Sequence, residues 1–351
     1  MIIALDAMGG DLAPAELVSG AVLAKREFGI DVALVGSPGA IREELSKLGE
    51  KPSAIEIVEA AEVIQMDEPP VQAVRQKKQA SINVAMGQIK SGSAAAVVSA
   101  GNTGAVMASA LLNLGRVKGT ERPALGAMAP FTEKGILILD VGANVDCKPS
   151  WLVQFAQMGS VYMEKVLGIA RPRVGLLNIG EEETKGNELT QEVYRRLQET
   201  NLEFVGNVEP DRVPSGVADV LVTDGFTGNV AVKVTEGVAD FIFSQLRETL
   251  TSRLHYKAAA AVLRPALMQM RSKMDYAEYG GAPLLGVNGV VIIAHGRADS
   301  QAIKSGLRLA QEAASSGMLE ALRGALVSPD RDGAKENRET AGATSRGETT
   351  A

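Results

Sequence analysis

The sequence predicts an α/β protein with a mainly parallel sheet flanked by helices. Short apolar runs recur along the chain, and their hydrophobicity is continuous rather than alternating, which is typical of strands covered on both faces. Long stretches of helical pattern separate most of these runs, and such alternation favours right-handed crossovers between parallel strands. The predicted strands cover residues 2–5, 31–36, 55–59, 94–99, 135–139, 173–179, 218–223 and 289–294.

Two helix beginnings between these strands support the assignment. Ser37 places a capping hydroxyl directly before Pro38, and Asp11 lies three residues ahead of Pro14. Both arrangements are typical of the entry into a helix, because proline is tolerated in the first turn.

The organisation of the chain is that of one body with a polar end. The length of 351 residues suits one large domain or two, but no repeat with a fixed period and no Pro- or Ser-rich linker marks a division, so we assign residues 1–328 to one α/β domain. Residues 329–351 contain no Val, Ile, Leu, Met or aromatic residue. Nothing there can offset the entropy of ordering the chain, which predicts a disordered tail.

Composition and charge narrow the function classes. Gly contributes 37 residues and aromatic residues only 4% of the chain, which favours tight turns over the aromatic platforms that bind single-stranded nucleic acid. The 36 basic and 42 acidic residues give a net charge of −6, the wrong sign for a surface that neutralises a phosphate polymer. We therefore expect no nucleic-acid partner, while local basic patches remain compatible with this balance.

Cysteine and histidine are too few for a disulfide framework or a structural zinc site. The chain has one cysteine, Cys147, and two histidines, His255 and His295, which cannot supply an intrachain disulfide or four Cys/His ligands. The first residues have no basic leader and meet Asp6 early, and no apolar run approaches the roughly 18 residues of a membrane span. We expect a cytoplasmic protein.

Five of the predicted strands are followed by loops rich in Asp, Asn and Gly. In an open parallel sheet, ligands bind beyond the carboxyl ends of the strands, so we expect the five loops to converge on one rim. Glycines let backbone N–H groups approach a ligand, and a glycine loop that enters a helix adds the positive end of its dipole, which favours phosphate. The loops are ALDAMGGD at 4–11, VVSAGNTGA at 97–105, ILDVGANVDCKP at 138–149, LLNIGEEETKGNE at 176–188 and VTDGFTGNV at 222–230.

The best fit to a phosphate-binding loop is GNTG at residues 101–104. A strong helical pattern over residues 105–114 follows it, so that Asn102 and Thr103 would present their side chains where a helix begins. Taken alone, these residues are equally explained as an N-cap with turn glycines. The recurrence of similar residues in five loops favours a binding site.

No standard nucleotide or nucleophile signature competes with this interpretation. In GEEETKGN, from Gly180, the lysine precedes the second glycine instead of following it as in a Walker loop, and G-x-G-x-x-G follows none of the predicted strands. There is no G-x-S-x-G elbow, so a serine acyl-enzyme is not expected. Cys147 could be a nucleophile, but a lone cysteine more often packs in a core.

The sequence leaves two interpretations open for three carboxylates and two for one lysine. Asp6, Asp140 and Asp224 lie at the ends of three strands and could jointly hold a divalent cation, but we favour hydrogen bonds to loop amides and helix caps. Lys185 follows three glutamates in its loop and is either a surface charge or a ligand for phosphate and carbonyl oxygens.

A basic amphipathic stretch begins near residue 249, and residues 249–274 contain no acidic side chain. We expect a helical hairpin over about 249–276, with Pro265 starting or kinking its second segment. The pattern is compatible with docking on a membrane surface or an acidic partner, and equally with a dimer interface. The basic positions are Lys257, Arg264 and Arg271, and the apolar stripe beside them comprises Leu263, Leu267, Met270 and Met274.

Six segments, in matching order, resemble the bacterial phosphate acyltransferase (PlsX) family. They are IALDAMGGDLAP, SAGNTGA, ILDVGAN, NIGEEETKGN, TDGFTGNV and GVNGVVIIAHGRAD. The resemblance covers about residues 1–320. It implies a fold like that of isopropylmalate dehydrogenase and phosphotransacetylase, from which the helical hairpin protrudes.

The resemblance also implies an activity and its partners. The reaction is reversible transfer of a long-chain acyl group from acyl carrier protein to inorganic phosphate, and the acyl phosphate then serves a membrane glycerol-3-phosphate acyltransferase in phospholipid synthesis. The family implies a homodimer whose paired hairpins contact the inner face of the cell membrane. It implies neither a metal nor a nucleotide cofactor.

Under this hypothesis, phosphate itself attacks the thioester, so the enzyme needs a phosphate cradle and donors for the developing oxyanion rather than a nucleophile. We expect Lys185 and Asn229 to be the catalytic residues that stabilise charge at the phosphate and carbonyl. Asn144 and Asp224 are expected to orient the reactants. The phosphate- and substrate-binding set is Asp6, Gly9, Gly10, Gly101, Asn102, Thr103, Gly104, Asn144, Asp224 and Gly228.

Acyl carrier protein is acidic and would seek a basic patch. Two patches besides the hairpin are available, namely Arg75, Lys77 and Lys78, and Arg116, Lys118 and Arg122. Two other functions stay open: a phosphotransacetylase that uses coenzyme A, and a membrane-recruited protein that binds acyl thioesters or phosphate without turnover.

Overall fold

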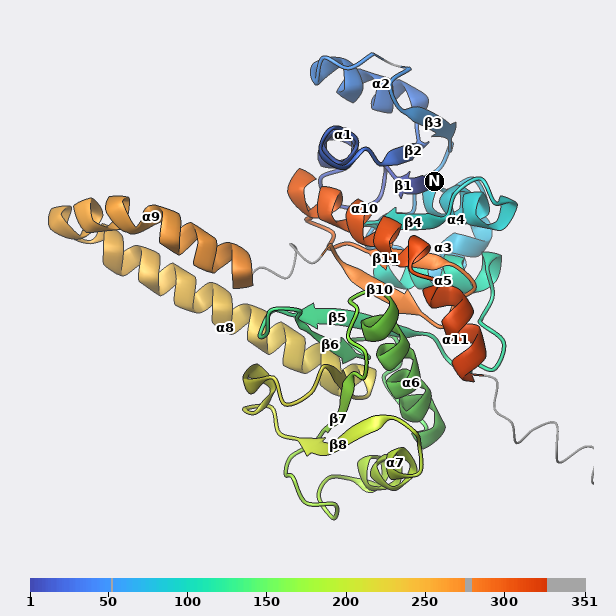
Figure 1. Ribbon diagram of the computed structural model, residues 1–351. Helices are drawn as coiled ribbons and strands as arrows, with labels where there is room; N and C mark the ends of the chain where they lie inside the picture. Colours follow the sequence, from blue (N-terminus) through green and yellow to red (C-terminus); the bar gives the residue numbers. More distant parts are fainter. Residues whose placement is uncertain (52, 275–279, 327–351) are drawn as a thin grey trace, which may run out of the picture.

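The computed structural model describes residues 1–51, 53–274 and 280–326. Within them, eleven strands form one sheet in the order β3-β2-β1-β4-β11-β10-β5-β6-β9-β7-β8 (Figure 1). The strands are β1 (Ile2–Asp6), β2 (Asp31–Gly36), β3 (Glu56–Glu59), β4 (Ala96–Ser99), β5 (Ala124–Ala129), β6 (Ile136–Leu139), β7 (Arg173–Leu177), β8 (Glu203–Val208), β9 (Val220–Val222), β10 (Ala282–Leu285) and β11 (Val290–Ile293).

Helices cover the sheet and connect its strands. They are α1 (Ala15–Phe28), α2 (Pro38–Lys47), α3 (Pro70–Gln76), α4 (Ser81–Ser91), α5 (Thr103–Asn113), α6 (Pro149–Lys165), α7 (Glu188–Gln198), α8 (Gly225–Thr251), α9 (Leu254–Met274), α10 (Ser300–Ser315) and α11 (Met318–Leu326), with a short 3₁₀ turn at Val213–Ser215.

All eight predicted strands are present, and seven of the ten strand pairings in the described residues are parallel. The predicted fold class is therefore confirmed. Three strands escaped prediction. β5 is rich in Ala and Gly, β10 has only four residues and includes Pro283, and β8 lies at an edge of the sheet, so none of them shows the β-branched run that marks a central strand.

The missed strands β5 and β10 change the direction of the sheet. β10 is antiparallel to β11 and to β5, and β5 is antiparallel to β6. As a result, the block of β1 to β4 with β11 runs opposite to the block of β6, β9, β7 and β8. The expectation of one rim made by strands that all run the same way is wrong, since the loops after the strands divide between two blocks.

The twist of the sheet also rotates the two blocks of strands relative to each other. Neighbouring strands are rotated by roughly 20–25°, so the six steps from β1 to β9 accumulate roughly 120–150°. A rotation of that size turns the strands of one block well out of line with those of the other.

Both faces of the sheet are buried. Along β1, Ile3 and Leu5 belong to the apolar cluster that includes α1 and α10, whereas Ala4 belongs to the cluster that includes α4 and α5. This alternation follows from the two-residue period of a strand. Helix α6 joins the first cluster, and Val232 near the base of α8 packs against a third cluster over β6 and β7.

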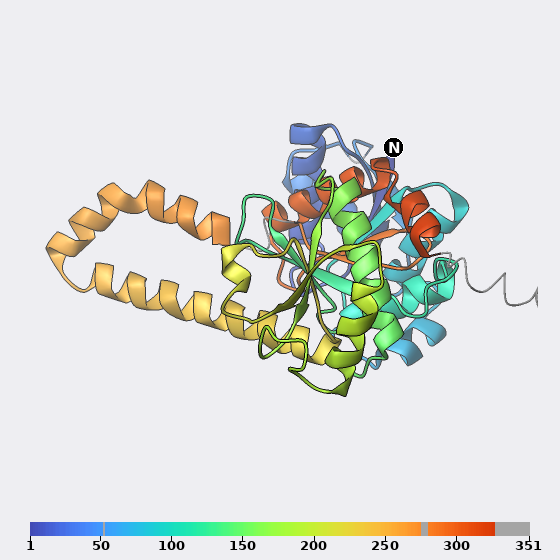
Figure 2. The same ribbon diagram turned by 60° about the horizontal axis from the view of Figure 1, so that its bottom comes forward.

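Helices α8 and α9 form a hairpin that projects from the body (Figures 1 and 2). The predicted bounds of 249–276 are wrong at the first end, because the hairpin begins at Gly225 directly after β9 and turns between Thr251 and Leu254. The acid-free window marked only the second helix. Pro265 lies inside α9 and does not start a new segment.

Some predictions lie beyond the described residues. The polar tail at 329–351, the side chains of Arg271 and Met274, and the end of the expected hairpin at 275–276 all fall there. Over the described part of the chain, no helix has both the length and the apolar character needed to cross a membrane.

Candidate functional site

The loops after β1 and β4 lie against each other. Gly9 sits so close to the Gly101 backbone that a Cβ at Gly9 would come within 2.8 Å of the Gly101 nitrogen. Ser99 connects the loops further, because its hydroxyl donates to Asp6 Oδ2 at 2.7 Å and accepts from the Gly101 N–H at 3.1 Å. The carboxylate thus fixes the hydroxyl, and the hydroxyl fixes the first amide of the GNTG loop.

The Asp6 side chain is buried against these two loops. Its side chain is 2% exposed, and burial raises the pKa of the carboxyl, while hydrogen bonds from Ser81, Ser99 and the Met8 and Gly9 amides oppose the rise. A carboxylate so enclosed holds loop amides in place. Asp6 therefore belongs to the framework of the predicted binding set.

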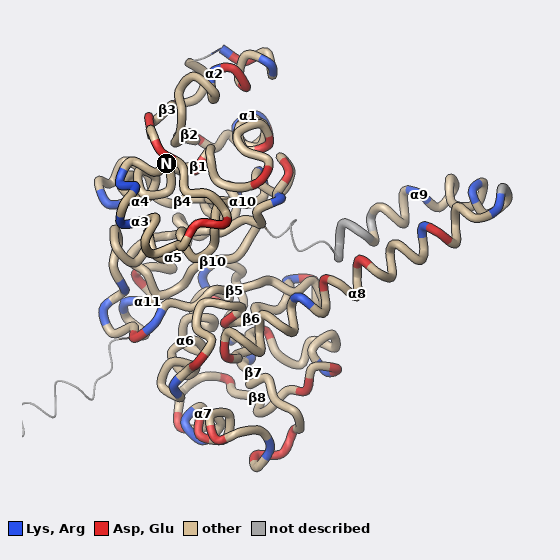
Figure 3. Tube along the Cα trace, turned by 180° about the vertical axis from the view of Figure 1, so that it is seen from behind, with Lys and Arg blue, Asp and Glu red and all other residues tan. Residues whose placement is uncertain are grey.

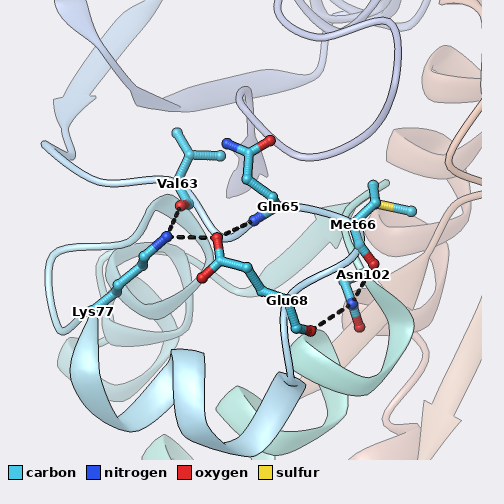
Figure 4. A network of polar contacts seen from close by, with 6 residues as sticks. All are labelled: Val63, Gln65, Met66, Glu68, Lys77 and Asn102. Carbon is cyan, nitrogen blue, oxygen red and sulfur yellow. Dashed lines mark hydrogen bonds and ion pairs between the residues drawn. The ribbon is translucent and has the colours of Figure 1, made fainter.

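Asn102 is also tied into the framework (Figure 4). Its Oδ1 accepts from the Ala105 N–H at 3.1 Å as the N-cap of α5. Its Nδ2 donates to the carbonyl oxygens of Met66 and Glu68 at 2.8 and 3.4 Å, and the Glu68 carboxylate pairs with Lys77 Nζ at 2.6 Å. Asn102 thus holds the neighbouring loop in place. Thr103 is the residue of the GNTG segment that is exposed.

The loop after β11 completes this first group, and sequence reasoning gave it no role. The Asp11 N–H donates to the Gly296 carbonyl at 2.7 Å, and a Cβ at Gly10 would meet the same oxygen at 3.0 Å. Arg297 Nε lies 3.6 Å from Asp11 Oδ2, with 82% of the arginine side chain exposed. Residues 2–24 and 91–115 contain no Lys or Arg, so Arg297 brings positive charge to a glycine-lined surface that has none of its own.

His295 shapes the same loop. Its Nδ1 accepts from the Arg297 N–H at 3.2 Å, which ties the backbone of Arg297 to the ring. The signal for both residues was present in GVNGVVIIAHGRAD, where His295 and Arg297 follow a predicted strand.

A second group forms around Asp140, at the end of β6. Its carboxylate is fully buried and accepts five N–H bonds. Burial raises the pKa of this carboxyl, and the N–H donors oppose the rise. The donors are the amides of Leu125, Gly142, Ala143 and Asn144 and the Nδ2 of Asn144, at 2.7–3.3 Å.

The first turn of α8 lies directly on this loop. The Gly225 N–H donates to the Asn144 carbonyl at 2.8 Å. A Cβ at Gly225 would overlap the Asn144 backbone, and one at Gly228 would overlap the Asp140 carbonyl. Asp224 caps the helix, accepting from the Thr227 N–H at 2.8 Å and the Thr227 hydroxyl at 2.7 Å.

The exposed Asn229 lies at the mouth of this second group. Its amide approaches Gly142, with Oδ1 3.8 Å from where a Cβ of Gly142 would be. The structure therefore brings four predicted site residues together at the base of the hairpin, namely Asn144, Asp224, Gly228 and Asn229.

Lys185 stands in the loop after β7, which is the neighbour of β9 in the sheet. Buried Asn178 anchors this loop by donating to the Lys185 carbonyl at 3.2 Å. The ammonium group lies 3.8 Å from Glu182 Oε2, and the lysine side chain is 47% exposed. An exposed pair at that distance is weak, so the ammonium can exchange Glu182 for an anionic ligand.

Two alternatives from the sequence do not fit this geometry. Across the described residues, no three His, Cys, Asp or Glu side chains gather to hold a metal ion, and Asp6, Asp140 and Asp224 each bond to loop or cap donors instead. Burial raises the pKa of the Cys147 thiol to about 12. A thiol of that pKa is a poor nucleophile at neutral pH.

Comparison with known proteins places these loops in a family. Residues 1–321 match the family model described as a fatty acid synthesis protein. The chain is 53% identical over 324 residues to a phosphate acyltransferase from Desulfitobacterium hafniense, covering 92% of this chain and 97% of that one. It is 54% identical over 309 residues to a phosphate acyltransferase from Brevibacillus brevis, covering 88% and 92%.

Solved structures with similar folds share far less sequence. A phosphotransacetylase from Streptococcus pyogenes superposes with a TM-score of 0.59 at 18% identity, over 90% of this chain and 94% of that one. A 4-hydroxythreonine-4-phosphate dehydrogenase from Klebsiella pneumoniae gives 0.54 at 15% identity, over 90% and 99%. These likenesses confirm the predicted fold.

Proposed function

The chain belongs to the fatty acid synthesis protein family, and we propose that it transfers a long-chain acyl group from acyl carrier protein to inorganic phosphate. It is a phosphate acyltransferase, as its relatives at about half identity are. Acyl carrier protein as the donor, and acyl phosphate for a membrane glycerol-3-phosphate acyltransferase as the outcome, are the finer parts of the proposal.

The chemistry rests on one observation: the glycine-lined loops at the strand ends lie beside cationic and amide side chains. The Cys147 thiol near them has a pKa that burial raises, so it is not available as a nucleophile. Phosphate is a nucleophile in its own right. An enzyme that aligns it with a thioester and stabilises the developing oxyanion can dispense with a covalent acyl intermediate.

We assign the two groups of loops to the two reactants. The loops at residues 6–11, 101–104 and 294–299 cradle phosphate with backbone N–H groups, and Arg297 supplies countercharge, because a guanidinium matches phosphate geometry. Lys185 and Asn229 act at the second group, donating to the thioester oxygen and to phosphate as negative charge develops. Asp224 and Asn144 orient these residues through the start of α8. The mechanism requires no metal or nucleotide.

The hairpin suits a dimer and a membrane surface. Helix α8 exposes large apolar side chains that a monomer leaves in water, at Val230, Val234, Val238, Phe241 and Ile242. On α9, Leu263 and Met270 are about half exposed, Leu267 is partly buried, and Lys257 and Arg264 are exposed beside them. Apolar residues flanked by basic ones favour the interface of an anionic bilayer, and we propose a cytoplasmic homodimer that contacts the inner face of the membrane.

The test of this function is the conversion of palmitoyl acyl carrier protein to acyl phosphate with radiolabelled phosphate and EDTA present. Palmitoyl coenzyme A runs in parallel. Labelled acyl phosphate that forms only with the carrier-protein thioester establishes the acyl donor. Transfer only from coenzyme A would replace it by a phosphotransacetylase reaction, and no transfer from either thioester by folded protein would leave a binding protein.

A further inference from the structure

We propose that acyl carrier protein docks on a basic surface centred on Trp151, which we call the Trp151 patch and define as Arg116, Lys118, Arg122, Lys148 and Trp151. This inference rests on the proposed function, since it assigns a place to the donor of the same site. Its basis is the arrangement of cations around one aromatic ring.

Trp151 holds two cations in position. The guanidinium carbon of Arg122 lies 5.0 Å from the indole centroid, and Lys148 Nζ lies 5.9 Å from it. The indole N–H donates to Glu121 Oε2 at 2.8 Å, which fixes the ring. Charges held over a ring lose less side-chain freedom on binding than charges on mobile stems, so a partner meets a prepared surface.

The chain around these residues is also fixed. The Arg116 carbonyl accepts from Asn288 Nδ2 at 2.6 Å, and the Val117 N–H donates to the Gly286 carbonyl at 3.0 Å. On the other side, Gln154 of α6 accepts from the Glu121 N–H at 2.8 Å and donates to the Gly119 carbonyl at 2.9 Å. The patch therefore spans two segments whose relative position is set by hydrogen bonds.

The positive charges of the patch are not neutralised by ion pairs among the described residues. Arg116, Lys118, Arg122 and Lys148 are all exposed, and none of them takes part in the ion pairs that the described residues form. The two segments that carry the patch, residues 116–122 and 146–151, contain two carboxylates, Glu121, which the indole engages, and Asp146. Four cations against two carboxylates, on a chain whose net charge is −6, fit an acidic protein.

The patch adjoins the second group of site loops. Pro123, next to Arg122, accepts through its carbonyl from Asn144 Nδ2 at 2.8 Å, and the same amide donates to Asp140 at 2.9 Å. Lys148 follows Cys147, whose thiol donates to the Asn144 carbonyl at 3.4 Å. A carrier protein seated here stands beside the residues that would receive its thioester.

The competing surfaces are less suited. In the patch of Arg75, Lys77 and Lys78, the central Lys77 is already paired with Glu68 and bonded to the Val63 carbonyl (Figure 4). On the hairpin, the exposed Lys257 and Arg264 of α9 stand beside the exposed apolar residues Leu263 and Met270, and Figure 3 shows that the hairpin projects on the side of the body opposite to α3, α4 and α11.

Trp151 makes the test direct, because it is the chain's only tryptophan. The experiment titrates the full-length enzyme with a holo acyl carrier protein that lacks tryptophan, and follows indole fluorescence at low and at high salt. We expect a saturable change whose midpoint moves to higher carrier concentration with salt, because the contact is electrostatic.

Charge reversal supplies the second arm. The double variant Arg122→Glu, Lys148→Glu should abolish the fluorescence change and raise KM for palmitoyl acyl carrier protein by about tenfold or more, leaving KM for phosphate unchanged. The matched control is Arg75→Glu, Lys78→Glu, which makes the same charge change at two exposed cations elsewhere and should match wild type.

The outcomes separate this inference from the proposed function. Turnover of the carrier thioester by wild type with an unchanged KM in Arg122→Glu, Lys148→Glu overturns the docking surface and leaves the function standing. A raised KM in the control alone moves docking to α3. No turnover of the carrier thioester by wild type rejects the proposed donor itself.

Discussion

At the scale of residues, the buried carboxylates Asp6 and Asp140 at the strand ends hold the loops in place through hydrogen bonds. Asp140 accepts five N–H bonds and Asp6 aligns Ser99 with the GNTG loop. Neither carboxylate is more than 2% exposed. Lys185 and Asn229, which we propose as the residues that meet substrate, have exposed side chains.

Replacing Asp140 with Asn tests the supporting role. The amide would set an NH₂ donor against the loop amides, so we expect unfolding in urea to show a stability loss of about 2–3 kcal/mol. Asp146→Asn, at an exposed neighbour of the same loop, should leave stability within about 0.5 kcal/mol. Equal stability of the Asp140 variant and wild type would contradict the role.

Replacing Lys185 with Ala tests the catalytic role. Loss of one donor to a developing oxyanion lowers kcat by about 100- to 1,000-fold. The exposed charge makes little contribution to the fold, so the urea midpoint should be unchanged. Lys165→Ala, which removes an exposed lysine at the end of α6, is the control. Wild-type turnover in Lys185→Ala would remove this residue from the mechanism.

At the scale of elements, α8 begins where two glycines allow it to touch the Asp140 loop. The helix contains two further test positions of opposite character. Gly228 has no room for a Cβ against the Asp140 carbonyl, whereas Gly237 has nothing within 4 Å of such an atom. The same substitution should therefore have opposite signs.

Gly228→Ala should lower both stability and kcat, because the base of the hairpin, with Asn229 on it, must move away from the Asp140 carbonyl. Gly237→Ala should raise the free energy of unfolding by roughly 0.5–1 kcal/mol, since alanine loses less backbone entropy in a helix. Both values come from urea denaturation. If the two variants shift stability in the same direction, the packing of α8 on this loop is not as described.

The contact between Arg173 of β7 and Asp219 beside β9 makes the stability of the fold depend on pH. Asp219, just before β9, accepts from the Arg173 N–H, Nε and Nη2 at 2.8, 3.0 and 2.9 Å. Burial acts to raise the pKa of Asp219, but the bonds to Arg173 outweigh it, and the pKa lies below the ordinary 3.8. The folded state therefore binds fewer protons than the unfolded state in acid, and this contribution to stability is present above about pH 4 and lost as pH falls through the lowered pKa.

Asp219→Asn removes the titrating group, so the variant should be less stable than wild type at pH 7 and the gap should narrow toward pH 3. Urea midpoints measured at both values check this. A constant gap would assign the effect of Asp219 to its shape rather than its charge.

At the scale of the whole molecule, the hairpin is the part that the body does not bury. Phe241 is 64% exposed and Val238 51% exposed, on a helix that is long enough to carry its apolar face well away from the sheet (Figure 2). Exposed apolar area of this kind is stabilised by a second copy or by lipid.

If the proposed homodimer forms through α8, Val238→Asp with Phe241→Asp should shift it to monomer in sedimentation velocity and lower its flotation with vesicles of anionic lipid. Leu48→Asp, at an exposed leucine beyond α2, is the control and should change neither. A Val238/Phe241 double variant that still sediments as a dimer would place the subunit contact elsewhere.

The sequence by itself determined the elements and the chemistry of their ends. Eight continuous apolar runs predicted eight strands, because burial on both faces leaves its mark in local composition. Glycine and asparagine after those strands marked the loops, since turn geometry and close backbone approach are local requirements. The resemblance of six segments identified the family.

Only the tertiary structure decided how these parts are joined. β5 and β10, whose small residues and proline give no strand signal, reverse the sheet and divide the site loops between two blocks. The pairing of Ser99 with Asp6, of Arg122 with Trp151 and of Arg297 with Asp11 joins residues far apart in the chain. Such contacts depend on strand order and twist, which no local pattern of residues encodes.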